Sequence, residues 1–290
     1  MHIRANQKIE CALYVVATPI GNLGDITLRA LDVLGAVAVV AAEDTRNTRH
    51  LLQHHGIGDA KLLALHQHNE RAGAEKIITL LQQGQSVALV TDAGTPAVSD
   101  PGALLVEEVR AAGFRVIPIP GASAAVTALS ASGLSAPHFL FYGFLPNKSA
   151  ARRTALQALS ELPCTLVFYE APHRILECVA DLHAVFGDVR EIVFARELTK
   201  LFESIYRCKL NGAMDWLNSD PNNQRGEFVL LVSGAAPRGE DIDAQAERVL
   251  AALLGELPLK QAVGLAVQIT GLNKNALYEH ALILKQALKQ

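Results

Sequence analysis

The feature that most restricts the fold is a series of short apolar segments without the polar alternation of a half-exposed strand. Five of them occupy the first half of the chain, and segments with helical spacing of apolar residues separate them. Strands that are apolar on both faces and alternate with helices are typical of a parallel sheet covered on both sides. The predicted strands are residues 13–18, 36–42, 61–65, 86–91 and 115–119, and the predicted helices are residues 26–35, 70–84 and 100–113.

The last of these helices has the clearest start signal. Asp100 is the expected cap, Pro101 stands at the first helical position and Gly113 follows the end.

The alternation of predicted strands and helices is interrupted near residues 130–138, where we predict a domain boundary. Five further strands follow, and no helical pattern separates the last two, so the second sheet is predicted to be mixed. The chain after about residue 241 is predicted to be helical, with a helix, a Thr-Gly-Leu turn and a second helix; a helix-turn-helix and a plain helical hairpin both fit this tail. The predicted strands are residues 139–144, 164–169, 191–195, 202–210 and 227–234, and the predicted domains are 1–132, 133–236 and 237–290.

Composition excludes several classes of protein. No apolar run approaches the roughly 20 residues that span a bilayer, and the N-terminus lacks the long apolar region of a signal peptide, so we predict a cytoplasmic protein without membrane contact. The four cysteines are scattered, and no histidine stands at zinc-like spacing, so we predict no metal. The net charge of −3 argues against a generally basic nucleic-acid binder. Any RNA contact must then come from a local basic patch.

Polar and glycine-rich segments follow nearly every predicted strand. Ligands of open α/β sheets bind outside the carboxyl ends of the strands, and glycine loops let the backbone approach them closely. Neither G-x-G-x-x-G nor a P-loop motif is present, which disfavours an ordinary dinucleotide or nucleoside triphosphate site. We therefore predict a binding site of another kind at this edge. The segments are residues 19–25, 43–49, 92–102, 120–124, 143–153, 169–174 and 195–200.

Seven motifs follow one another along the chain: ATPIGNLGDIT, EDTRNTRHLL, VTDAGTPAVSDPG, PIPGASA, FYGFLP, YEAPHR and RELTK. Together they resemble those of the bacterial 16S rRNA (cytidine-2'-O)-methyltransferases, which modify a decoding-centre cytidine and belong to the tetrapyrrole methylase fold family. The resemblance covers about residues 11–234 and implies two α/β domains with S-adenosylmethionine between them, a homodimer, and 16S rRNA of the 30S ribosomal subunit as substrate.

The resemblance also implies a set of cofactor-binding residues in three places. These are a central methyl-donor loop, a second cofactor segment, and a wall of the second domain around the adenosine. They are, in that order, Asp92, Gly94, Thr95, Pro96, Val98, Ser99 and Asp100; Ala122, Ser123 and Ala124; and Phe168, Tyr169, Leu231, Val232 and Ser233.

A ribose 2'-hydroxyl is a poor nucleophile, so a general base or a polarising contact should assist its methylation. The leading candidates for a base are Glu170 and Asp44, with Glu43 and Arg174 as further catalytic candidates. Two alternatives stay open: Glu170 and Arg174 could form an i,i+4 helix pair, and Asp44 could be a helix cap.

Several residues of the same edge are predicted to contact RNA. The strongest local basic cluster is Lys148, Arg152 and Arg153, for which a solvated helix start is the alternative. The loop 19–25 departs from the GPGD-like loop of tetrapyrrole-modifying members at Ile20 and Asn22, which argues against a porphyrin-like acceptor. The full set of predicted RNA contacts is Asn22, Asp25, Arg46, Lys148, Arg152, Arg153, His173, Arg196 and Lys200.

Two other functions remain as alternatives. The first is a methyltransferase of the same fold that acts on a small molecule such as a tetrapyrrole. The second is a non-catalytic RNA-binding module, which would bind RNA without affinity for S-adenosylmethionine.

Overall fold

The computed structural model describes residues 9–58, 60–66, 69–235 and 244–287. The chain forms two compact units, of which the first comprises residues 1–160 and 164–233 and the second residues 161–163 and 234–290. Both sheets belong to the first unit. The domain boundaries predicted after residues 132 and 236 therefore stay predictions, and the second of them lies outside the described residues.

The first sheet consists of five parallel strands in the order β3-β2-β4-β1-β5. All five predicted strands are present, and each is shorter than its apolar segment. A parallel sheet with both faces covered was the prediction, and it is confirmed. The strands are β1 (Leu13–Val16), β2 (Val39–Ala42), β3 (Lys61–Ala64), β4 (Val87–Val90) and β5 (Val116–Ile119).

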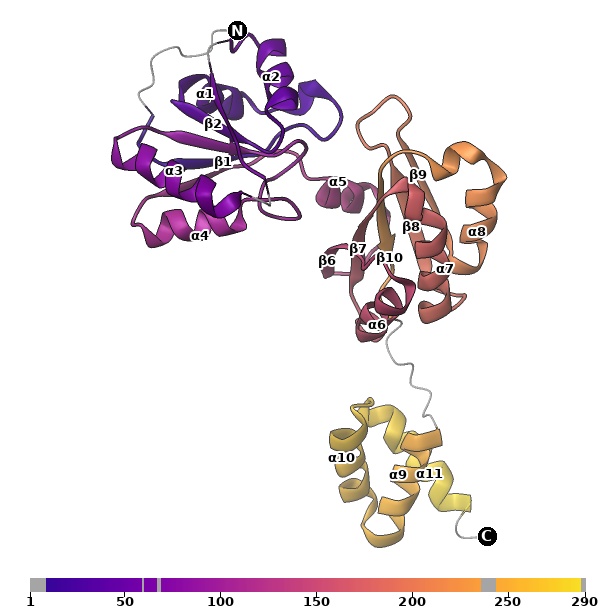
Figure 1. Ribbon diagram of the computed structural model, residues 1–290. Coiled ribbons are helices and arrows are strands. Elements are labelled where there is room, and N and C mark those ends of the chain that lie inside the picture. Colours follow the sequence, from indigo (N-terminus) through magenta and orange to yellow (C-terminus); the bar gives the residue numbers. More distant parts are fainter. Residues whose placement is uncertain (1–8, 59, 67–68, 236–243, 288–290) are drawn as a thin grey trace. The chain divides into compact units, whose positions relative to one another are not determined.

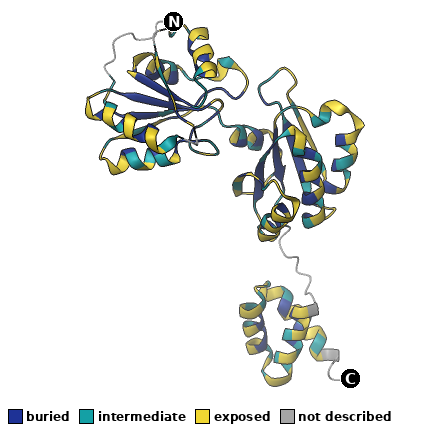
Figure 2. Cartoon of the chain, viewed as in Figure 1, coloured by how far each residue is buried: buried dark blue, intermediate teal, exposed yellow. Residues whose placement is uncertain are grey.

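Helices cover both faces of this sheet, as Figure 1 shows. Successive side chains of a strand point to opposite faces, so Tyr14 packs with α1 (Leu28–Ala36) and α2 (Thr45–His54), whereas its neighbour Leu13 packs with α3 (Glu70–Gln82) and α4 (Ala103–Ala111). The central strands are buried on both sides, and the helices expose their outer faces (Figure 2). This double burial explains why the strands carry no polar alternation.

The N-terminus of α4 differs from the prediction. Its cap is Gly102, at φ 129°, and not Asp100. The carboxylate of Glu70, the first residue of α3, accepts hydrogen bonds from the backbone N–H groups of Gly102 (2.8 Å) and Leu104 (3.1 Å). A distant side chain thus caps the helix, and Asp100 is left for another role.

The second sheet has the order β6-β7-β10-β8-β9 and is mixed, as predicted. β6 and β7 are parallel, while β10 runs antiparallel to both β7 and β8. Helix α5 (Ala124–Ala131) packs on the face that includes Val167, Val193 and Val229. The strands are β6 (Phe139–Phe144), β7 (Thr165–Glu170), β8 (Glu191–Arg196), β9 (Ser204–Lys209) and β10 (Phe228–Val232), and the other helices are α6 (Ser149–Leu159), α7 (Ile175–Phe186) and α8 (Leu210–Ser219).

The expectation that the last two strands follow one another directly was wrong. Helix α8 lies between β9 and β10 and buries Leu210, Ala213 and Leu217. These residues stand at i, i+3 and i+7, which is helical spacing. The pattern is diluted by Asn211 and Gly212, which explains why it was missed.

The second unit contains three helices among its described residues: α9 (Ala244–Glu256), α10 (Leu259–Thr270) and α11 (Lys274–Ala287). Their shared core includes Leu250, Val263 and Leu277. Gly271 ends α10 in the left-handed conformation, φ 69°, at the predicted Thr-Gly-Leu turn. In the part of the chain that the structure describes, no helix has the length and apolarity needed to cross a membrane.

Candidate functional site

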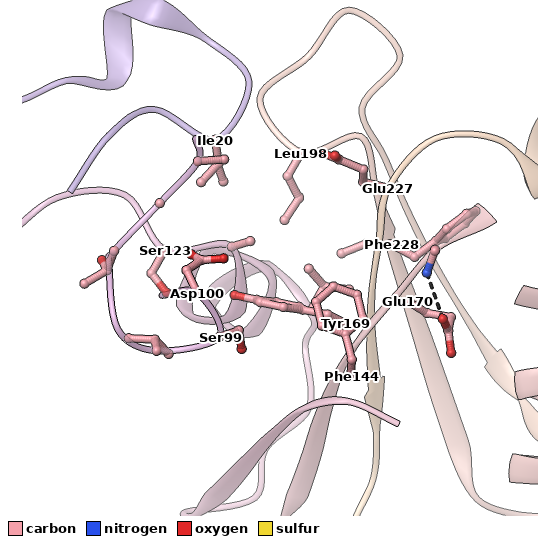
Figure 3. Close-up of a pocket in the computed structure, with 18 of the residues that line it drawn as sticks. Ile20, Ser99, Asp100, Ser123, Phe144, Tyr169, Glu170, Leu198, Glu227 and Phe228 are labelled. Carbon is pink, nitrogen blue, oxygen red and sulfur yellow. Dashed lines mark hydrogen bonds between the residues drawn. The ribbon is translucent and has the colours of Figure 1, made fainter. Parts of the chain in front are cut away.

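A pocket of about 370 Å³ lies within the first unit, between loops of the first sheet and one face of the second. Its volume is that of a small-molecule site. Figure 3 shows Ile20 and Leu198 on opposite walls, with Tyr169 and Phe144 below them. The lining comprises Ile20, residues 93–95 and 98–100, Ser123 and Ala124 from the first sheet's side, and Phe144, residues 169–172, Ala195, Leu198 and residues 227–229 from the second.

The loops after β1, β4 and β5 form one connected wall. Thr18 and Gly94 exchange backbone hydrogen bonds of 2.9 and 3.1 Å, and the Thr95 hydroxyl donates to the carbonyl of Ala122 at 3.1 Å. Gly94 has φ 86°, which favours glycine at this turn. The glycine-rich loops that the sequence singled out therefore lie side by side at the carboxyl edge of the first sheet.

The opposite wall comes from the second sheet. The Tyr169 hydroxyl accepts a hydrogen bond from the backbone N–H of Ala125 at 3.2 Å, and burial raises the pKa of Tyr169. Across the pocket, a Cβ on Gly21 would lie 2.6 Å from the Lys200 stem, so the loops after β1 and β8 are in close contact. Contact at both places holds the two walls together around the cavity.

Three carboxylates gather at the ends of β2 and β4. Burial raises the pKa of Asp100, and the nearby Asp92 raises it further. Burial likewise raises the pKa of Glu43, to which the charges of Asp100 and Asp92 add. Asp92 accepts hydrogen bonds from the backbone of Asp44 (3.2 Å) and from the Asn47 amide (2.9 Å). A concentration of negative charge beside an apolar cavity is suited to a cationic ligand or to proton transfer.

We expect Glu43→Gln to raise the thermal midpoint of unfolding near pH 7. Because the pKa of Glu43 is raised on folding, the folded protein binds this proton more tightly than the unfolded chain does. Stability from this group is therefore present at low pH and is lost as pH rises from the ordinary glutamate range through the raised pKa. Glutamine remains uncharged, so its advantage should appear above that window and vanish below it.

Thermal unfolding at a series of pH values measures this effect. Glu75→Gln, at an exposed position of α3, is the matched control and should show no such pH-dependent gain. A Glu43→Gln variant that is less stable than the wild type at neutral pH would show that the ionised carboxylate has a stabilising partner, contrary to our expectation.

Eight of the predicted cofactor-binding residues line the pocket. Asp92, Pro96 and Ala122 belong to the same loops but do not border the cavity, and Asp92 and Ala122 instead hold neighbouring segments in place. The eight are Gly94, Thr95, Val98, Ser99, Asp100, Ser123, Ala124 and Tyr169.

Phe168, Leu231, Val232 and Ser233, which the resemblance places in this wall, do not border the cavity. Phe168 points to the face opposite Tyr169, because neighbours on a strand alternate. β10 is antiparallel to β7 and pairs Phe228 with Glu170, so the start of β10 meets the pocket and its end lies away from it. Ser233, beyond that end, accepts a hydrogen bond from the Glu191 N–H instead.

Glu170 is among the residues that line the pocket, but its side chain has no exposed area, which argues against the prediction that it is the base. Its carboxylate pairs with Arg174 at 3.1 Å, which has the i,i+4 spacing of the alternative, but Glu170 ends β7 and the two residues do not share a helix. The carboxylate also accepts the Ala171 N–H, the contact drawn in Figure 3, and together with burial it raises the pKa of the Cys178 thiol. The Arg174 guanidinium donates to the carbonyl of Leu145 at 2.7 Å, so it holds a loop and is not a catalytic group.

Asp44 is a helix cap, which was the other alternative. It accepts the backbone N–H of Arg46 at 2.8 Å and pairs with the Arg46 guanidinium. These contacts with Arg46 lower the pKa of Asp44 to about 2. A carboxylate with so low a pKa is a weak general base at neutral pH, so the structure removes Asp44 as the leading candidate.

The basic cluster at α6 divides into two kinds of residue. Arg152 is fully buried and donates to the carboxylate of Asp181 at 2.7 Å, so the prediction of an RNA contact was wrong for this residue. Arg153 shares the same carboxylate but leaves 54% of its side chain exposed, and Lys148 is exposed. Only the latter two could meet a phosphate.

The remaining predicted RNA contacts differ in solvent exposure and in whether their side chains are held by other residues. The Arg46 side chain is 87% exposed, although it pairs with Asp44. Arg196 donates to Ser204, and Lys200 pairs with both Glu197 and Glu227, so these two cations hold the β8–β9 loop. The exposed residues of the set are Asn22, Asp25, Arg46, Lys148, Arg153 and His173.

Several lining residues were missed by the sequence reasoning. Ile20 and Phe144 stand inside quoted motifs, so a signal for them was present. Phe228 and Val229 begin a strand, and no local pattern reveals that this strand is antiparallel. Among the described residues, no cluster of histidine, cysteine and acidic side chains could hold a metal ion.

Comparison with known proteins gives two family matches. Residues 12–213 match the family described as Tetrapyrrole (Corrin/Porphyrin) Methylases, and residues 240–285 match the RsmI C-terminal HTH domain. The chain is 57% identical over 272 residues to the ribosomal RNA small subunit methyltransferase I of Pseudomonas aeruginosa, covering 93% of this chain and 96% of that protein. It is 54% identical over 270 residues to the protein of the same name from Escherichia coli O157:H7, covering 93% and 94%.

A solved structure resembles the fold at low sequence identity. The crystal structure of uroporphyrin-III-C-methyltransferase from Thermus thermophilus superposes with a TM-score of 0.54 at 23% identity, covering 77% of this chain and 93% of that one. This likeness confirms the two-sheet architecture.

Proposed function

The chain belongs to the tetrapyrrole methylases and, among them, to the ribosomal RNA small subunit methyltransferase I family, and on this basis we propose that it methylates 16S ribosomal RNA. The proposed acceptor is the ribose 2'-hydroxyl of a cytidine in the decoding centre, and the proposed donor is S-adenosylmethionine. The 30S subunit is the proposed partner, which also makes the cytoplasm the proposed location.

The observation that supports this proposal most directly is the composition of the pocket. Asp100, a half-buried carboxylate, stands on one wall and the rings of Tyr169 and Phe144 on the other. Carboxylates and aromatic faces both attract cations, and the volume of about 370 Å³ is in the range of small-molecule sites. These residues fit S-adenosylmethionine, which when bound supplies a methyl group on a cationic sulfur.

The chain's own contribution is alignment and exclusion of water. Ile20, Leu198 and Val229 give the pocket apolar walls and belong to one hydrophobic cluster. Holding an acceptor oxygen in line with a methyl carbon can supply several kcal/mol of barrier reduction, up to about 7–11. The hydrogen bond from Ala125 to Tyr169 fixes the start of α5 against the second sheet, which keeps the two walls at a constant separation.

For the proton of the acceptor hydroxyl we propose Glu43. Of the three carboxylates predicted as catalytic, Glu170 and Asp44 are engaged in structural contacts. Burial and the charges of Asp100 and Asp92 raise the pKa of Glu43, which moves it towards the pH at which a general base is most effective.

The RNA contacts that we propose are the exposed members of the predicted set. Lys148, Arg153 and Arg46 are suited to phosphate, and His173, Asn22 and Asp25 to ribose or base. Their number is small, which agrees with a net charge of −3 and a local rather than general basic surface.

We also propose a homodimer. Leu201 is 90% exposed and Phe202 67% exposed on the β8–β9 loop, and Ile205 and Tyr206 follow on the edge strand β9. Exposed apolar patches of this kind mark interaction surfaces.

The test is methyl transfer from labelled S-adenosylmethionine to 30S subunits taken from a strain that lacks the protein. We expect one labelled nucleoside, 2'-O-methylcytidine, in digests of the 16S rRNA. Naked 16S rRNA and a porphyrinogen are the comparison acceptors. Label in the porphyrinogen and none in RNA would support the small-molecule alternative, and RNA binding without affinity for S-adenosylmethionine would support the non-catalytic one.

A further inference from the structure

We propose that Phe144 is a stacking platform for the nucleobase of the acceptor nucleotide. The inference rests on the proposed function and deepens it, because it assigns the part of the pocket that meets RNA. The acceptor nucleobase and the adenine of the donor both present a flat face that could stack on the ring. The structure favours the acceptor.

The position of Phe144 results from an irregularity in β6. The register between β6 and β7 shifts between Phe141 and Gly143, and Gly143 has φ 82°. In a regular strand Phe141 and Phe144 would point to opposite faces. With the shift, both rings meet Tyr169, at centroid distances of 4.9 and 5.6 Å. Bulges next to active sites re-aim a side chain in this way.

The backbone around Phe144 is fixed from two sides. A Cβ on Gly143 would lie 3.1 Å from the Ser99 hydroxyl of the donor loop, so β6 is pressed against the opposite wall of the pocket. Beyond Phe144, the Arg174 guanidinium binds the carbonyl of Leu145 at 2.7 Å and the Asn147 side chain at 2.5 Å. The buried Glu170–Arg174 pair therefore serves to hold the segment that carries the ring.

Despite this support, the ring itself is not a core residue. Phe144 is 54% exposed, whereas the next residue, Leu145, is 2% exposed. A large apolar side chain that is held rigidly and left in solvent contributes little to folding, and such a face is typical of a recognition surface.

Its neighbours indicate that the partner is the acceptor. Both rings line the pocket, but Phe144 is 54% exposed whereas Tyr169 is half-buried, so Phe144 is the ring that an RNA approaching from solvent would meet. Lys148, four residues further along, is exposed and has no carboxylate within ion-pair distance among the described residues. Proteins recognise single-stranded RNA with such an arrangement: a base stacks on the aromatic face, and the nearby cation neutralises a phosphate.

The test separates the acceptor from the donor. Phe144→Leu retains an apolar side chain and removes the ring, Phe144→Tyr retains the ring, and Phe139→Leu is the matched control, since Phe139 is on the same strand, 48% exposed and outside the pocket. We measure KM for 30S subunits, kcat, and the Kd of S-adenosylmethionine by calorimetry. We expect Phe144→Leu to raise KM for subunits by about 5- to 100-fold, the change that loss of one base–aromatic stack produces, with the donor Kd unchanged.

The Phe144→Tyr and Phe139→Leu variants should retain the wild-type KM. A weakened donor Kd with an unchanged KM for subunits would assign the ring to the adenine and overturn the proposal, as would wild-type KM in Phe144→Leu or an equal loss in Phe144→Tyr. Absence of transfer to RNA by the wild type would overturn the proposed function itself, and the role of the ring with it.

Discussion

Replacing Asp181 by alanine is expected to lower the free energy of unfolding by about 3–5 kcal/mol, because it leaves a buried guanidinium without its counter-charge. Arg152 has no exposed side-chain area, and its partner Asp181 is only 3% exposed. Burial by itself raises the pKa of Asp181, but hydrogen bonds from Arg153, Arg152 and Ser149 outweigh it and hold the pKa below the ordinary aspartate value. The contribution of this group is therefore present at neutral pH and is lost as pH falls through the acidic range.

Chemical denaturation of the purified variants measures the effect. Glu177→Ala is the matched control on the same helix: its carboxylate lies 3.6 Å from the same guanidinium, but its side chain is 75% exposed. An exposed pair is worth at most about 1 kcal/mol. The double replacement of Arg152 by methionine and Asp181 by leucine removes both charges and should recover most of the stability. Equal losses in Asp181→Ala and Glu177→Ala would contradict this interpretation of the pair.

The position of Arg152 illustrates what a sequence pattern can and cannot resolve. Residues 152, 156 and 159 stand at i, i+4 and i+7 and are the buried residues of α6, so the helical spacing already placed Arg152 on the apolar face. The prediction grouped Arg152 with Lys148 and Arg153 as a basic cluster and did not take this spacing into account. The partner could not be predicted, since Asp181 lies 29 residues away on another helix.

The first sheet was predictable because its rules are local. Each strand is followed by its own loop, and in a parallel sheet all these loops meet at one edge, so the sequence alone was enough to bring together the loops that contain Ile20, Gly94 and Ser123. The second sheet breaks this rule. Because β10 is antiparallel, its first residues, Phe228 and Val229, reach the pocket, whereas Leu231, Val232 and Ser233, which the resemblance implied, do not border the cavity.

The choice of face within β7 could not be predicted either. Its residues are apolar almost throughout and nearly all buried, so period-2 alternation gives no indication of which side chains face the ligand. Tyr169 turned out to face the pocket, and Phe168 and Glu170 the helices. A carboxylate at the end of a strand is therefore a candidate for catalysis only after its face is known.

Replacing Asp100 by asparagine is expected to weaken the binding of S-adenosylmethionine by about 10- to 100-fold, since a hydrogen bond or ion pair to a charged group is worth about 1.5–3 kcal/mol. Asp100 lines the pocket near Tyr169, and burial raises its pKa, with the charge of Asp92 adding to the effect. A cationic ligand favours the ionised carboxylate, so wild-type affinity should increase as pH rises through the raised pKa. The asparagine variant is isosteric and cannot ionise, so its affinity should lose this pH dependence.

Calorimetric titrations across pH with two ligands separate charge from shape. Adenosine lacks the sulfonium and the α-ammonium group of S-adenosylmethionine, and its affinity should be the same in wild type and Asp100→Asn. Asp92→Asn is the matched control, because Asp92 belongs to the same loop but binds the backbone of Asp44 and the amide of Asn47 outside the cavity. If adenosine and S-adenosylmethionine lost affinity equally, Asp100 would act by shaping the loop and not by its charge, and the electrostatic account of donor binding would fail. A selective loss for the cationic ligand would show that the Asp100 carboxylate orients the donor. Asp100 is available for this role because Glu70, and not Asp100, caps α4.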